Sequence, residues 1–86
     1  MNWEEVKKTY PSEWVLVEAI KAYSKDGQRY VEDMAVINRF SDSLDVMKKY
    51  KELHRLHPFR EYYFFHTDRK ELDIHERNWF GIRGVK

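Results

Sequence analysis

Residues 14–40, WVLVEAIKAYSKDGQRYVEDMAVINRF, carry the clearest structural signal in the chain. Apolar, β-branched and aromatic residues are concentrated in 14–23 and again in 29–40, as is typical of strands. Between the two runs, Asp26-Gly27 supplies the positive φ values that a tight turn requires. The stretch therefore predicts a hairpin in which 14–23 pairs antiparallel with 29–40.

A helix and a third strand are expected directly after this hairpin. Residues 41–43, Ser-Asp-Ser, offer three candidate N-caps, and Pro58 stops the helix after about His57. Residues 60–67 then form a strand centred on Tyr-Tyr-Phe-Phe. The helix carries an apolar stripe that comprises Val46, Met47, Tyr50, Leu53 and His57.

The two ends of the chain complete the expected fold. Residues 2–9 leave room for a short helix, which Pro11 would end. Residues 68–71 have the pattern of a capping box that opens a helix, whereas 72–74 alternate like a strand, and we favour a turn followed by a short fourth strand. The whole chain, 1–86, is predicted to be one α+β domain with a three- or four-stranded antiparallel sheet. One main helix packs on one face of that sheet, in the order β-β-α-β(-β).

The composition is that of one small domain of an intracellular type. The 86 residues include 16 Lys or Arg and 15 Asp or Glu, so no strong field of one sign is expected. Without cysteine there is no disulfide and no thiolate, which fits a reducing compartment. The start of the chain lacks the apolar run of a signal peptide, and we expect a cytoplasmic protein with no membrane segment.

Both faces of the predicted sheet are apolar. Side chains alternate between faces along a strand, and Trp14 and Leu16 oppose Val15 and Val17. One helix covers one face, so the other must be covered by the termini, by a second copy of the chain or by a different protein. The termini supply four apolar candidates, which are Trp3, Trp79, Phe80 and Ile82.

The two apolar faces of the sheet predict a non-enzymatic protein-interaction module. A homodimer is one form that such a module can take. The chain has 3 Trp, 6 Tyr and 5 Phe, more rings than so small an interior readily holds. Rings that the chain does not bury are available to a partner. The candidate interaction surface consists of Tyr62, Tyr63, Phe64, Phe65, Trp79 and Phe80.

Two arrangements of histidines can be compared with a metal site and a catalytic base, and we favour neither interpretation. His54 and His57 share a helix face, but no Cys and no H-E-x-x-H spacing accompanies them, so roles near the helix end explain them better than zinc does. His66 and Asp68 share a strand face as a general base requires, yet a strand end followed by a turn explains both. We therefore predict no catalytic residue, no metal site and no cofactor.

The alternative function is a single-stranded nucleic-acid-binding domain. Lys48, Lys49, Lys51 and Arg55 form a basic helix face in a chain rich in strand aromatics, and rings beside a basic groove can stack bases. Glu52 interrupts that face, and the strands lack the RNP pattern. A solvated helix surface is the simpler interpretation.

Residues 10–18, Tyr-Pro-Ser-Glu-Trp-Val-Leu-Val-Glu, resemble the opening of a group of small uncharacterised bacterial proteins. Residues 63–67, Tyr-Phe-Phe-His-Thr, and 76–83, Glu-Arg-Asn-Trp-Phe-Gly-Ile-Arg, are similar to the closing segments of that group. The resemblance spans most of 10–83 and rests on apolar motifs. It implies a stand-alone bacterial domain, and it implies no activity because none is established for the group.

Overall fold

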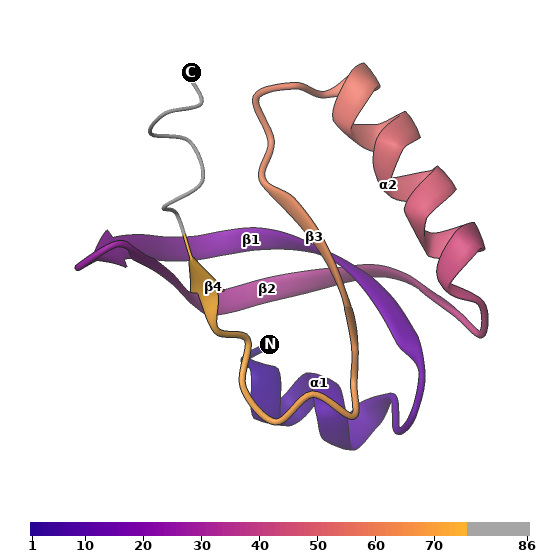
Figure 1. Cartoon of the computed structure of the whole chain (residues 1–86), viewed down its shortest axis with the longest axis horizontal. Helices are drawn as coiled ribbons and strands as arrows, with labels where there is room; N and C mark the ends of the chain where they lie inside the picture. Colours follow the sequence, from indigo (N-terminus) through magenta and orange to yellow (C-terminus); the bar gives the residue numbers. More distant parts are fainter. Residues whose placement is uncertain (76–86) are drawn as a thin grey trace.

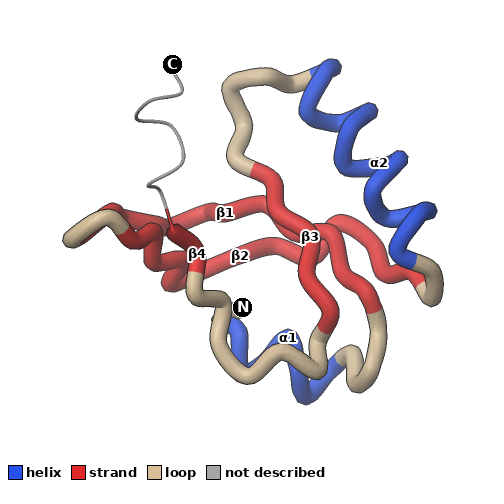
Figure 2. The backbone as a smooth tube through the Cα atoms, in the orientation of Figure 1, coloured by secondary structure: helices blue, strands red, loops and turns tan. Residues whose placement is uncertain are grey.

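The computed structural model describes residues 1–75, and it confirms an α+β fold built on one antiparallel sheet (Figure 1). The strands are arranged β3-β1-β2-β4, so the long hairpin is central and two short strands form the edges (Figure 2). The two helices lie on opposite sides of this sheet (Figure 1). The elements are α1 (Trp3–Thr9), β1 (Trp14–Lys25), β2 (Gln28–Phe40), α2 (Ser43–Leu56), β3 (Tyr62–His66) and β4 (Ile74–His75).

The β1–β2 hairpin turns at the predicted dipeptide. Asp26 and Gly27 have φ angles of 52° and 77°, and a type I′ turn requires positive φ at both central residues. Pairing extends from this turn to the far ends of both strands, as predicted. Register shifts nevertheless leave Ile20, Glu32 and Ile37 without a paired residue across the hairpin. Because bulges interrupt the alternation of side chains, simple counting does not assign faces beyond Ala19.

Helix α2 covers one face of the sheet, as expected for the main helix. Of the three candidate N-caps, Asp42 caps the helix, since its side chain accepts the backbone N–H of Leu44 at 3.0 Å. Val46 is fully buried, and the ring of Tyr50 lies 5.1 Å from that of Phe64 on β3. No helix within residues 1–75 is long and apolar enough to cross a membrane.

Helix α1 covers the opposite face. Asn2 and Glu5 form a reciprocal capping box, which allows so short a helix to begin in a defined position. Trp3 and Val6 are buried in a cluster with residues of β1, β2 and β3, and the Trp3 ring meets Phe65 edge-on at 5.6 Å. The chain itself therefore covers the second face. Of the three alternatives that the sequence left open, this is cover by a terminus. Trp79, Phe80 and Ile82 lie outside the described residues.

The segment after β3 is a turn and not a helix. The Thr67 hydroxyl donates to the carbonyl of Tyr10 at 2.6 Å and accepts the N–H of Glu13 at 3.0 Å, which fixes the end of β3 beside the start of β1. Leu72 and Ile74 then pack against the buried cluster, and β4 pairs with the first residues of β2. The expected turn and short fourth strand are confirmed up to residue 75.

Candidate functional site

The aromatic residues of β3 pack against the interior of the domain. Tyr62 and Phe65 are each 6% exposed, so neither is available to a partner at the surface. Tyr63 and Phe64 are half-buried, against the α1 cluster and Tyr50 respectively. The remaining members of the predicted interaction surface, Trp79 and Phe80, lie outside the described residues. An interaction surface must therefore be sought elsewhere on the part of the chain that the structure describes.

The four histidines are distributed over α2 and its C-cap, the end of β3, and β4. Within residues 1–75, no group of three or more possible metal ligands comes together. His66 accepts the N–H of Asp68 at its Nδ1, at 3.1 Å. The Ser12 hydroxyl donates to the Asp68 carboxylate at 2.9 Å rather than to the imidazole, so this is not a nucleophile–base pair. The group closes the turn after β3.

Among the described residues, the basic face of α2 does not adjoin the rings of the sheet. Lys48 and Lys51 are exposed, while Lys49 is held by Glu52 at 2.8 Å. The sheet rings that would stack bases are those of β3, and they are buried or half-buried under the two helices. The two features that suggested nucleic-acid binding in the sequence therefore do not form one surface.

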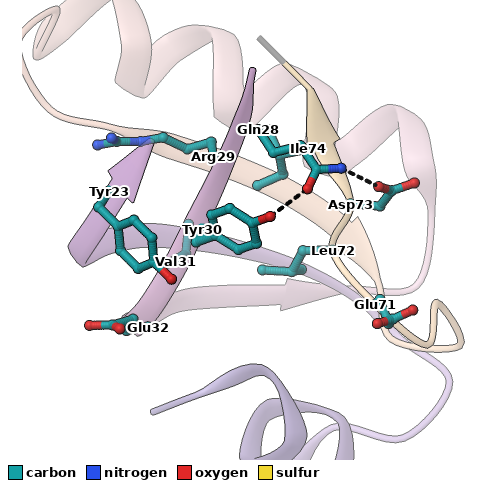
Figure 3. Close-up of a pocket in the computed structure, with 10 residues that line it drawn as sticks. All are labelled: Tyr23, Gln28, Arg29, Tyr30, Val31, Glu32, Glu71, Leu72, Asp73 and Ile74. Carbon is teal, nitrogen blue, oxygen red and sulfur yellow. Dashed lines mark hydrogen bonds between the residues drawn. The ribbon is translucent and has the colours of Figure 1, made fainter. Parts of the chain in front are cut away.

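A groove of about 510 Å³ lies between β2 and the segment that leads into β4 (Figure 3). Its volume is within the range of roughly 300–1,000 Å³ that is usual for ligand sites. We call it the β2 groove, and the residues that line it are Tyr23, Gln28, Arg29, Tyr30, Val31, Glu32, Glu71, Leu72, Asp73 and Ile74.

Half of the lining of the β2 groove is apolar or aromatic. Tyr23 and Tyr30 are paired across the hairpin, and their rings stack with centroids 5.1 Å apart. They are 45% and 39% exposed, so these are rings that the chain leaves accessible. The Tyr30 hydroxyl donates to Gln28 at 2.6 Å, and Gln28 in turn donates to Asp73 at 3.5 Å (Figure 3). These two bonds connect the tyrosines to the segment before β4.

The charged groups of the β2 groove are mainly acidic. Three carboxylates, those of Glu32, Glu71 and Asp73, stand on its lining, against a single guanidinium from Arg29. That guanidinium is already engaged, because its Nε and Nη2 donate to the two oxygens of Glu61 at 2.9 and 2.8 Å. Glu32 lies 3.7 Å from Lys21 and Asp73 lies 3.1 Å from His75, so the excess negative charge that the groove presents beside its apolar surface comes mainly from Glu71 and Asp73.

The Arg29–Glu61 pair also explains the shifted pKa values next to the groove. The hydrogen bond from Arg29 lowers the pKa of Glu61, against the opposing effect of partial burial. Burial, followed by the hydrogen bond that its hydroxyl donates to Glu61, raises the pKa of Tyr63. These shifts keep Glu61 ionised and Tyr63 neutral, as expected for a structural Arg29–Glu61 ion pair to which Tyr63 donates a hydrogen bond.

No protein-family model, curated protein or solved structure matches this chain. The functional assignment therefore depends on the geometry of the β2 groove and on the chemistry of its lining.

Sequence reasoning did not identify the β2 groove, because its two walls are distant in the chain. One wall is β2, whose role as a strand was predicted, and the other is residues 71–74, whose path was uncertain. A signal was nonetheless present, since Tyr23 and Tyr30 lie at equal distances from the Asp26-Gly27 turn. That symmetry predicts a cross-strand ring pair at the exposed end of a hairpin.

Proposed function

We propose that this protein is a small protein-interaction module whose β2 groove binds a cationic segment of a protein partner. The observation that carries the proposal is the combination of three carboxylates with a half-exposed tyrosine pair and apolar side chains in one groove. A segment with Lys or Arg next to an apolar or aromatic side chain has complementary chemistry.

Each part of such a segment has a counterpart in the groove. A Lys or Arg placed over a tyrosine ring gains a cation–π interaction of about 0.5–2 kcal/mol, depending on its exposure to water. Glu32, Glu71 and Asp73 attract the same charge and raise the rate of association at low salt. Val31, Leu72 and Ile74 can bury an apolar neighbour, at roughly 25 cal/mol for each Å² removed from water.

The same charges disfavour nucleic-acid binding in the β2 groove. A nucleic acid would bring phosphates against three carboxylates, and the Arg29 guanidinium is engaged by Glu61. An oligonucleotide is therefore the natural comparison ligand for a binding experiment.

A short labelled peptide that alternates lysine and phenylalanine tests the proposal. We expect it to bind with an affinity that falls as salt is added, while a glutamate–phenylalanine peptide and a thymidine oligonucleotide do not bind. Glu71→Lys should weaken binding by about tenfold or more, because it places like charge in the groove. Glu71 is exposed, so this variant should remain folded.

Glu4→Lys is the matched control, since it makes the same change of charge on α1 and outside the groove. It should leave peptide affinity unchanged, as measured by fluorescence anisotropy. Equal binding of the acidic peptide or the oligonucleotide, or an unchanged affinity in Glu71→Lys, would contradict the assignment of the groove.

A further inference from the structure

The last residues of α2 and the loop that follows carry an exposed apolar patch surrounded by positive charge. We call this the Phe59 patch, and its residues are Arg55, Leu56, His57, Phe59 and Arg60. Phe59 is fully exposed and Leu56 is 55% exposed, although both belong to residue types that are usually buried. The turn is nevertheless ordered by a hydrogen bond from the N–H of Arg60 to the carbonyl of His57, at 3.1 Å. Phe59 is thus displayed on a defined turn.

The charge around the Phe59 patch is opposite to that of the β2 groove. Residues 48–60 contain five Lys or Arg and a single acidic residue, Glu52, which is held by Lys49. Arg60 approaches Glu18 only at 3.8 Å and remains 59% exposed, so its guanidinium is accessible. The next carboxylate in the chain, that of Glu61, is engaged by Arg29.

The Phe59 patch and the β2 groove belong to opposite edges of the sheet. The patch immediately precedes β3, which is one edge strand, whereas the groove lies beside β2 and β4 at the other edge. In Figure 1 the loop that follows α2 is likewise well separated from β4. A molecule in this conformation does not insert its own patch into its own groove, but two molecules can be joined in this way.

We infer that the Phe59 patch of one copy docks in the β2 groove of a second copy. This inference rests on the proposed function and names the cationic segment as one from the same chain. Phe59 would lie against Tyr23, Tyr30 and Leu72 of the second copy, and the arginines would face its carboxylates. Because the two surfaces differ, the contact is head-to-tail and produces either a ring or an open chain of molecules.

A complementation experiment distinguishes this contact from a symmetric dimer. Phe59→Ser removes the patch and Glu71→Lys impairs the groove, and both residues are exposed, so both variants should retain the circular dichroism spectrum of the wild type. Wild-type mass, followed by light scattering across dilution, should rise with concentration, whereas each variant alone should remain monomeric. An equimolar mixture should form a dimer and nothing larger, because the mixture contains just one intact patch and one intact groove for each pair.

The controls match each change elsewhere on the surface. Leu44→Ser removes an exposed apolar side chain from the other end of α2, and Glu4→Lys reverses a charge on α1, so both should assemble like the wild type. A wild type that is monomeric at every concentration overturns the inference, as does a mixture that fails to form the dimer. If the lysine–phenylalanine peptide still binds in that case, the proposed function stands and the cationic segment belongs to a different protein.

Discussion

At the scale of single residues, the Arg29–Glu61 pair joins parts of the chain that are 32 residues apart. Arg29 is at the start of β2 and Glu61 directly precedes β3, so the pair connects the two strands that flank β1. Ser24 on β1 adds a further acceptor for Arg29, at 3.0 Å. A bidentate pair with additional hydrogen bonds is the geometry in which an ion pair contributes most to a defined structure.

Glu61→Gln should lower stability at neutral pH by about 1–2 kcal/mol, because it removes the charge that Arg29 engages. Folding lowers the pKa of Glu61 below its ordinary value of 4.5. Its contribution is therefore complete above pH 4.5 and is lost as the pH falls through the lower folded value. Urea unfolding across pH 2–7 should show a weaker acid dependence in Glu61→Gln than in the wild type.

Glu4→Gln provides the comparison for loss of an exposed carboxylate and should remain close to the wild type in stability at neutral pH. An acid dependence in Glu61→Gln equal to that of the wild type would show that Arg29 does not stabilise the Glu61 carboxylate.

At the scale of elements, the hairpin depends on its turn. Gly27 has a φ of 77°, and a Cβ atom at this position would meet no atom within 4 Å. Gly27→Val should therefore destabilise the protein by about 1–2 kcal/mol through backbone strain alone, without a steric clash. Gly27→Asn should cost only about a few tenths of a kcal/mol, since Asn tolerates positive φ. Thermal unfolding measures both, and equal losses would exclude backbone strain as the cause.

The elements that the sequence predicted well are those specified by neighbouring residues. Asp26-Gly27 fixes the hairpin, and Asp42 together with Pro58 bounds α2, so short-range chemistry is sufficient for both. Alternation cannot be counted past Ile20, because a bulge there depends on how two strands fit one another and leaves no local pattern.

The candidate site was less predictable because tertiary contacts create it. The rings of β3 were expected at a surface, yet Tyr62 and Phe65 became interior once two helices had packed on opposite faces. The sequence does not state which rings a helix will cover. The β2 groove depends on where residues 71–74 return, and Leu72 and Ile74 are placed by the buried cluster rather than by their neighbours.

At the scale of the whole molecule, closure of the second face changes the argument for a partner. The sequence left open whether the termini, a second copy of the chain or a different protein covers the apolar second face, and Trp3 and Val6 of α1 cover it. Partner binding is therefore not required to complete the core. We therefore expect that association through surfaces outside the core, such as the proposed β2 groove and Phe59 patch, can be abolished without unfolding the domain.

Trp3→Ala tests whether α1 alone closes that face. Trp3 packs on Phe65, and its Nε1–H donates to the carbonyl of Arg69 at 2.9 Å, so truncation should cost about 3–5 kcal/mol. The total free energy of unfolding of a small domain is roughly 5 kcal/mol, and this variant should therefore be largely unfolded by urea at concentrations that leave the wild type folded.

Trp3→Phe retains a ring but removes the hydrogen bond, and its loss of stability should be intermediate between that of Trp3→Ala and none. Ile20→Ala, at a site that is 58% exposed, should change stability by about 0.5 kcal/mol or less. If Trp3→Ala unfolded at the same urea concentration as Ile20→Ala, α1 would not be a necessary part of the core, and another part of the chain or a second chain would have to cover this face.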